Sequence, residues 1–287
     1  MRFCMSTISM LGRRLDDAIL SHMKKGGIET IELFMQKPHF DQSDPSHISE
    51  ISGSLKNNGM NAISAHMPIY KYRLDDPGER KLLTLSLCDP DDSEREFAIS
   101  ELLSSIEACG TLGIRNIVVH TGLLGPAGES EKNREIEMCV RSLKRPVERA
   151  GELGVNLSIE NGTSPGVTVA MLHEVIKRIS RPNLGICVDV GHSNLFSKPE
   201  TDVDLSMPRL NSLHLHDNNG RSDQHYMPGE GMIAFDRIIS ILTANRFTGI
   251  VTLEVVGPLA ENVTMGEFSQ FSSRIHSKIS KMRKGSA

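Results

Sequence analysis

Short apolar runs alternate along this chain with longer segments in which apolar residues recur every three or four positions. The short runs have the length and composition of strands, and the longer segments have the periodicity of amphipathic helices. Helical segments 15–27, 99–113 and 139–154 end in glycine just before the next strand, as helix C-termini often do. Eight strands are predicted, at residues 2–8, 28–34, 61–66, 114–120, 155–160, 184–190, 210–216 and 250–256.

Strands that alternate with helices form right-handed βαβ units and a parallel sheet. Eight units predict the α/β class and a single (β/α)8 TIM barrel over residues 1–287. An open doubly wound sheet normally carries a GxGxxG fingerprint in its first turn, and TISMLGRRL lacks it. The longest connection, residues 67–93, follows the third strand, and a loop of that length is predicted to be a lid or a binding loop.

The composition is that of an ordinary globular protein, with 38% hydrophobic and 24% charged residues. Lys and Arg number 32 against 36 Asp and Glu, and the net charge of −4 argues against binding nucleic acid by charge alone. There is neither an apolar run of about 18 residues nor a signal-peptide core, so we expect no membrane span and a cytoplasmic location. Five widely spaced cysteines without a CxxC pair are typical of buried thiols in a reducing compartment.

Histidines and carboxylates gather at the predicted strand ends. Of the eleven histidines, five lie in helical or loop patterns and are expected to pack or to face solvent: His22, His39, His47, His173 and His276. The other six lie at the C-terminal end of a strand or in the loop after it: His66, His120, His192, His214, His216 and His225. Three carboxylates share these positions, namely Glu160, Asp189 and Glu254.

The C-terminal strand ends of a barrel converge on one face, where active sites lie. Several carboxylates are costly to bury unless a cation accompanies them, so this gathering predicts a divalent metal site. Mixed histidine and carboxylate ligands suit Zn²⁺, Mn²⁺, Co²⁺ or Fe²⁺ better than Ca²⁺, and Zn or Mn is expected. In VDVGHSN, Gly191 is expected to let the chain turn so that Asp189 and His192 both face this site. The alternative is a helix N-cap followed by a histidine in the first turn.

The chain resembles the xylose-isomerase-like TIM-barrel superfamily in six segments: AHMP (65–68), VVHTG (118–122), LSIENG (157–162), CVDVGHSN (187–194), HLHDNNGRSDQHYMPGEG (214–231) and TLEVV (252–256). The superfamily includes sugar and sugar phosphate isomerases and epimerases, inosose dehydratases and endonuclease IV. The joint pattern covers nearly the whole chain. It is specific to the superfamily and much less specific to one reaction.

The resemblance implies two nested metal sites. The mononuclear site of the sugar epimerases corresponds to Glu160, Asp189, His214 and Glu254. The trinuclear zinc site of endonuclease IV adds His66, His120, His192, Asp223 and His225. All of these positions hold the required residue types. The resemblance therefore implies at least one bound metal ion and at most three.

The first hypothesis is a divalent-metal-dependent isomerase or epimerase that acts on a sugar or sugar phosphate. The catalytic pair Glu160 and Glu254 would remove and return a proton through an enediolate beside a metal-polarised carbonyl. A tyrosine would cover the sugar ring and the GEG turn would bind a phosphate, although rim packing and a plain turn are the alternatives. The expected substrate-binding residues are His66, His192, His216, Tyr70, Gly229 and Gly231. The sequence is compatible with a homo-oligomer.

The second hypothesis is an endonuclease IV-like zinc phosphodiesterase that acts at abasic sites in DNA. Endonuclease IV inserts an arginine and bulky side chains into the duplex, whereas the matching loop, FMQKPHFDQSDPS (34–46), offers Lys37 and Phe40 but no arginine or tryptophan. That departure and the negative net charge favour a small molecule over nucleic acid as the partner. A third hypothesis, a metal-stabilised binding module without activity, explains the paired carboxylates less well.

Overall fold

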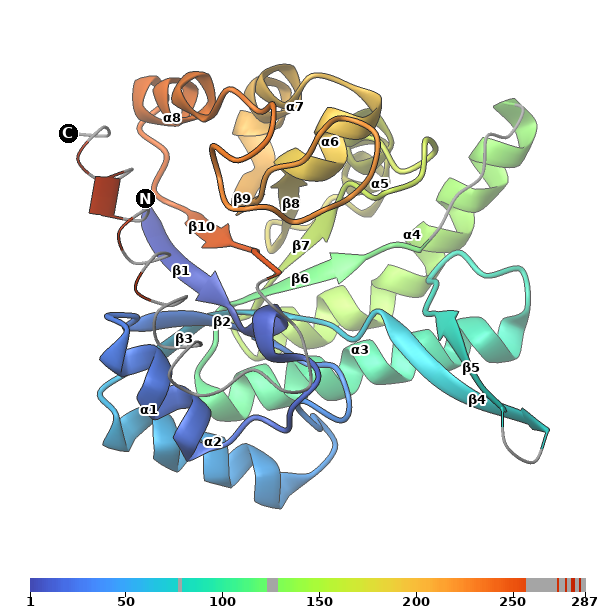
Figure 1. Ribbon diagram of the computed structural model, residues 1–287. Coiled ribbons are helices and arrows are strands. Elements are labelled where there is room, and N and C mark those ends of the chain that lie inside the picture. The colour runs from blue at the N-terminus through green and yellow to red at the C-terminus, as the bar shows by residue number, and fades with distance from the viewer. Residues whose placement is uncertain are drawn as a thin grey trace.

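Eight parallel strands close into a barrel in this computed structural model, which describes residues 1–76, 79–122 and 129–256 and five isolated later positions (Figure 1). The order around the barrel is β1–β2–β3–β6–β7–β8–β9–β10, and β10 pairs with β1. The α/β barrel expected from the sequence is therefore confirmed. The strands are β1 (Arg2–Ser6), β2 (Thr30–Phe34), β3 (Asn61–His66), β6 (Asn116–His120), β7 (Asn156–Glu160), β8 (Leu184–Asp189), β9 (Leu210–Leu215) and β10 (Ile250–Leu253).

Helices cover the outside of the barrel between successive strands. They are α1 (Asp17–Lys25), α2 (Pro45–Asn57), α3 (Asp92–Leu112), α4 (Glu129–Glu152), α5 (Val169–Ile179), α6 (Val190–Phe196), α7 (Pro199–Ser206) and α8 (Phe235–Ala244), with 3-10 turns η1 (Thr7–Met10) and η2 (Met207–Arg209). Side-chain caps begin several of them: Asp16 accepts a hydrogen bond from the Ile19 amide (2.9 Å), and Asp44 precedes a proline at the first position of α2. None of the described helices has both the length and the apolar character needed to cross a membrane.

The long connection after β3 contains regular structure, and its role as a lid or a binding loop stays a prediction. It contains an antiparallel hairpin of β4 (Tyr70–Asp76) and β5 (Glu79–Thr84), which projects away from the barrel (Figure 1). The Gln36 side chain anchors its base. Its Oε1 accepts hydrogen bonds from the Ile69 and Tyr70 amides (3.1 and 3.0 Å), and its Nε2 donates to the Tyr70 carbonyl oxygen (3.0 Å).

Alternate residues of each strand face opposite sides of the barrel wall. The outward residues are apolar and pack under the helices; they include Phe3, Met5, Ile31, Leu33, Ile117, Val119, Leu157 and Ile159. The inward positions of most TIM barrels hold bulky branched residues. Here they carry a layer of buried polar side chains: Glu32, Ser64, Asn116, Ser158, Ser212 and Thr252. The candidate site lies directly above this layer, at the C-terminal strand ends.

Candidate metal centre

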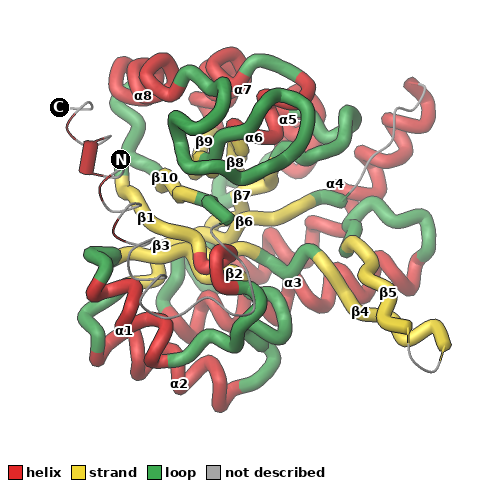
Figure 2. Tube along the Cα trace, viewed as in Figure 1, coloured by secondary structure: helices red, strands yellow, loops and turns green. Residues whose placement is uncertain are grey.

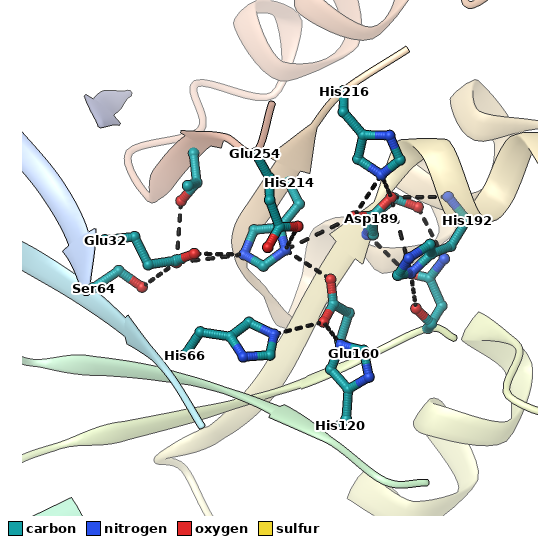
Figure 3. A network of polar contacts seen from close by, with 12 residues as sticks. Glu32, Ser64, His66, His120, Glu160, Asp189, His192, His214, His216 and Glu254 are labelled. Carbon is teal, nitrogen blue, oxygen red and sulfur yellow. Dashed lines mark hydrogen bonds and ion pairs between the residues drawn. The ribbon is translucent and has the colours of Figure 1, made fainter. Parts of the chain in front are cut away.

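Side chains from six strands point toward one another at the C-terminal end of the barrel (Figure 3). They meet because the parallel strands end at the same face of the barrel and alternate side chains of each strand point inward. His66 ends β3, His120 ends β6, Glu160 ends β7, Asp189 ends β8, His214 lies on β9 and Glu254 follows β10. Strand register adds to the convergence, because His120 pairs with Glu160 and Asp189 pairs with His214. The remaining predicted residues come from α6 and from the long β9–α8 connection, which Figure 2 shows as a loop running in front of α6.

The first ligand group consists of Glu160, Asp189, His214 and Glu254, whose donor atoms all lie within 4.8 Å of one another. His214 Nδ1 lies 2.7 Å from Glu160 Oε1 and 2.9 Å from Glu254 Oε2. Despite these distances, His214 Nδ1 and Glu160 Oε1 have no hydrogen-bond partner among the described residues. A buried ring nitrogen and a carboxylate oxygen that are close but unbonded fit the shared coordination of a cation.

The carboxylate of Glu160 also belongs to a neighbouring group. Its Oε2 lies 2.6 Å from His120 Nε2 and 3.4 Å from His66 Nε2. Burial opposes ionisation of Glu160, but His214 and His120 beside it hold the pKa of this carboxyl well below its usual range. Glu160 is therefore an ionised carboxylate that can bridge two adjacent cation positions.

A further ligand group lies beside the first and consists of His192, His216, Asp223 and His225. Asp223 Oδ2 lies 3.0 Å from His225 Nε2 and 3.3 Å from His192 Nε2. His216 Nε2 lies 2.9 Å from Asp189 Oδ1 and 3.6 Å from Asp223 Oδ1, so it connects the two groups. From the sequence, His216 was expected to contact the substrate or to support the ligand residues; the structure places it among the candidate ligands as well.

The orientation of three histidines supports metal binding at both places. His66, His192 and His225 each hold Nδ1 at 2.7 to 2.8 Å from a backbone carbonyl oxygen. A carbonyl oxygen only accepts hydrogen bonds, so Nδ1 carries the hydrogen, and in the neutral ring Nε2 keeps a lone pair. Each Nε2 faces a carboxylate oxygen, which is unfavourable unless a cation lies between them or the ring is protonated. Metal-ligating histidines are held in this way, so the residues fit a divalent metal.

Asp189 has both of the roles expected from the segment VDVGHSN, because it caps a helix and is also a candidate metal ligand. Its carboxylate caps α6, where Oδ1 accepts a hydrogen bond from the His192 amide (2.8 Å), and it also faces the ligand group. The expected role of Gly191 is corrected. Gly191 does not adopt a left-handed conformation; instead, a Cβ at this position would overlap the ring of His216. Glycine is needed here because an imidazole crosses the first turn of the helix.

The expected phosphate contact at the GEG turn is also corrected. The amides of Gly229 and Gly231 both donate to Asp217 Oδ2 (2.9 Å), and the Ile233 amide donates to Asp217 Oδ1 (3.1 Å). These N–H groups therefore bind a buried carboxylate and are not offered to a substrate. Tyr70 begins β4 with its side chain 37% exposed, and its contact with a substrate stays a prediction.

Sequence reasoning missed Glu32, on β2. This carboxylate is fully buried, and its two oxygens lie 3.2 and 3.3 Å from His214 Nε2. The available signal was a single charged residue between Ile31 and Leu33, two core residues of a short strand. The histidines assigned to packing behave as expected where they are described: His39 and His47 are buried and hydrogen-bonded to backbone carbonyl groups, whereas His276 lies outside the described residues.

Comparisons with known proteins assign the chain to a family. A family model described as xylose isomerase-like TIM barrel matches residues 20–267. The uncharacterized protein MJ1311 of Methanocaldococcus jannaschii is 28% identical over 167 residues, 56% of this chain and 57% of that protein. The chain thus matches little more than half of that relative. A probable endonuclease 4 of Methanoculleus marisnigri is 26% identical over 256 residues, 81% of this chain and 82% of that protein.

An inosose isomerase of Halalkalibacterium halodurans is 21% identical over 252 residues, 83% of this chain and 82% of that protein. Among solved structures, a D-tagatose 3-epimerase-like protein has a TM-score of 0.74 and 22% identity, and the match covers 99% of both chains. The IOLI protein with a bound zinc atom has a TM-score of 0.74 and 18% identity, and covers 96% of both chains. These structural likenesses support the fold.

Proposed function

Because the chain belongs to the xylose isomerase-like TIM barrel family, we propose that it is a divalent-metal-dependent enzyme that isomerises or epimerises a sugar or sugar phosphate. One observation carries the proposal: Glu160, at the end of β7, and Glu254, just after β10, are buried carboxylates that both approach His214 Nδ1. Paired carboxylates beside a metal suit proton transfer at a carbon next to a carbonyl. The relatives named as an inosose isomerase and a D-tagatose 3-epimerase-like protein support a carbohydrate substrate.

The protonation states of the two carboxylates suit this reaction. A bound divalent cation, held by Glu160, Asp189, His214 and Glu254, would polarise the substrate carbonyl and acidify the adjacent C–H bond. Burial opposes ionisation of Glu254, but His214 beside it holds the pKa of that carboxyl well below its usual range. Glu160 and Glu254 are thus both unprotonated at neutral pH, as a general base must be. Either carboxylate can remove the substrate proton, become a carboxylic acid and return that proton to the substrate; return from the opposite carboxylate requires that this group has first taken up a proton from solvent.

The loop after β2 argues for a small-molecule substrate rather than duplex DNA. Phe40, its one bulky candidate wedge, is fully buried and packs against the ring of His47. Lys37 Nζ lies 3.0 Å from Asp41 Oδ1 and 3.0 Å from Ser43 Oγ. Neither side chain is placed to enter a base stack. In this proposal His66, His192 and His216 lie within reach of substrate hydroxyl groups, and Tyr70 covers the sugar ring.

Exchange of substrate C–H hydrogen in D₂O tests the two-base assignment. We expect Glu254→Gln to slow exchange with ketose substrates at least about 100-fold, because a general base contributes that much or more. The control is Glu29→Gln, which changes an exposed carboxylate just before β2, at the opposite end of the barrel. Both variants are analysed for bound metal. Wild-type exchange by a fully metal-loaded Glu254→Gln protein would contradict the assignment.

The second ligand group favours one further candidate, a metal-dependent phosphodiesterase. His192, His216, Asp223 and His225 could hold additional ions beside the first group, and clustered ions activate water and stabilise a leaving oxygen in phosphoester hydrolysis. Elemental analysis of metal-replete protein and a nicking assay on an abasic duplex test this candidate. Several ions per chain together with nicking would support it, and a single ion without nicking would exclude it.

A further inference from the structure

The buried carboxylate of Glu32 lies behind His214, on the side away from the other ligand residues (Figure 3). His214 Nε2 lies 3.2 Å from Glu32 Oε1 and 3.3 Å from Glu32 Oε2, whereas Nδ1 faces Glu160 and Glu254. The two ring nitrogens point in different directions, so Glu32 does not bind the ion that Nδ1 faces. Consistently, Glu32 is in none of the candidate ligand groups of the described residues.

A directed series of hydrogen bonds across the barrel interior ends at Glu32. Ser158 Oγ donates to Asn116 Oδ1 (2.6 Å), and Asn116 Nδ2 donates to Ser64 Oγ (3.1 Å). Ser64 Oγ, which accepts from Asn116, donates its own hydrogen to Glu32 Oε2 (2.7 Å). Thr252 Oγ1 donates to the same oxygen (3.2 Å). Glu32 is therefore held in place as an acceptor by side chains of β3 and β10.

We propose that Glu32 is a positioning residue that holds His214 in the tautomer with the hydrogen on Nε2. A carboxylate offers only acceptor atoms, so the ring nitrogen that faces it carries the hydrogen. Nδ1 also faces two carboxylates, but a metal ion bound there would take its lone pair, so the single hydrogen of the neutral ring lies on Nε2, toward Glu32. The inference rests on the metal centre of the proposed function. Loss of such a partner typically weakens metal binding 10- to 100-fold.

The geometry makes Glu32→Gln a sharp test, because the two carboxylate oxygens are not equivalent. Ser64 and Thr252 both donate to Oε2, so the amide oxygen of a glutamine would take that position. The amide NH₂ would then occupy the position of Oε1, 3.2 Å from His214 Nε2. The amide oxygen at Oε2 would still accept from Nε2 (3.3 Å), but the NH₂ group would bring a donor close to the same nitrogen and so oppose a hydrogen on Nε2. The variant removes the negative charge of Glu32 and weakens the preference for the Nε2–H tautomer with almost no change in shape.

Metal affinity and the His214 tautomer are measured together. Zn²⁺ affinity is obtained by competition with a chelator, and the protonated ring nitrogen is identified by NMR of ¹⁵N-histidine protein. We expect Glu32→Gln to bind Zn²⁺ about 10- to 100-fold more weakly and to have a smaller fraction of His214 with the hydrogen on Nε2. Ser64→Ala, which loosens Glu32 but leaves its charge, should show a smaller loss of affinity with the tautomer unchanged, and it serves as the test if the glutamine variant does not fold.

The matched control is Ser212→Ala, which removes a buried hydroxyl two residues before His214 on the same inward face of β9. It should keep both the wild-type affinity and the wild-type tautomer. Wild-type affinity with the hydrogen still on Nε2 in Glu32→Gln would overturn the role of Glu32. Metal binding by the wild type without isomerase activity would overturn the proposed reaction and leave the role of Glu32 standing, whereas a wild type that binds no metal would overturn both.

Discussion

At the scale of single residues, Gly191 determines how closely the ring of His216 approaches α6. We expect Gly191→Ala to lower the free energy of unfolding by about 1–3 kcal/mol, the usual cost of overpacking a buried contact. The ring must also leave its present position beside Asp189 and Asp223, so we expect the affinity of the protein for Zn²⁺ to fall. Urea denaturation measures the first effect, and competition with a chelator measures the second.

Gly53→Ala is the matched control for that substitution. Gly53 lies inside α2, and no atom lies within 4 Å of the position that its Cβ would take. Alanine is the better helix former, so this variant should be stabilised by about 0.5–1 kcal/mol. Equal stabilisation of the Gly191 variant would show that the His216 ring does not press on the helix.

Asp223 governs the charge of His225 in the metal-free protein. Burial alone would lower the pKa of His225, but the hydrogen bond to Asp223 and the charge of Glu254 raise it from 6.5 to about 9. A raised pKa adds stability that is complete below pH 6.5 and is lost as the pH rises through 9. We therefore expect the free energy of unfolding of chelated protein to fall over this range, with a smaller slope in Asp223→Asn.

Metal affinity should change with pH in the opposite direction. A metal displaces the proton from Nε2, so binding should tighten between pH 6.5 and 9, while metal-free stability declines. Urea unfolding in chelator and Zn²⁺ titration at matched pH values compare the two trends. An Asp223→Asn protein with the full wild-type slope would assign the pH dependence to other groups.

At the scale of elements, Gln36 connects the β4–β5 hairpin to the loop after β2. Its side chain makes hydrogen bonds with the Ile69 amide and with both backbone groups of Tyr70. Gln36→Ala should lower the free energy of unfolding by about 1–3 kcal/mol and speed amide hydrogen exchange at Ile69 and Tyr70. Gln42→Ala is the control: it removes a second buried glutamine of this loop, whose Nε2 donates to Glu101 on α3 (2.6 Å). Equal exchange rates in the two variants would contradict an anchoring role of Gln36.

The sequence predicts an element well when its pattern of apolar and polar residues fits only one type of structure. All eight barrel strands follow from their alternation with helices, and the candidate ligands at their ends follow from the convergence of parallel strands. Glu32 was missed because a polar residue in an alternating strand usually faces solvent, whereas in a closed barrel the second face is the interior. The direction of the Gly229 and Gly231 amides and the left-handed backbone of His225 (φ 48°) depend on packing around Asp217 and Asp223, which residue spacing does not encode.

At the scale of the whole molecule, the candidate ligands connect β3, β6, β7, β8, β9 and β10 across the mouth of the barrel. A metal that binds only the folded state adds stability of about 2.7 kcal/mol when its free concentration is 100 times its Kd. Chelation should therefore lower the Tm by several degrees, and added Zn²⁺ or Mn²⁺ should restore it. Thermal unfolding with and without chelator makes the comparison.

The metal-dependent rise in Tm, measured in two variants, shows whether one bound ion or several stabilise the folded protein. Glu160 touches His66, His120 and His214, so Glu160→Gln should abolish most of the metal-dependent rise in Tm. Asp223→Asn affects only the second group. If that group also holds an ion, Asp223→Asn should lose part of the rise and lower the number of ions bound. If the rise and the stoichiometry stay at wild-type values, the second group acts through hydrogen bonds to a substrate, and the isomerase mechanism then accounts for the whole site.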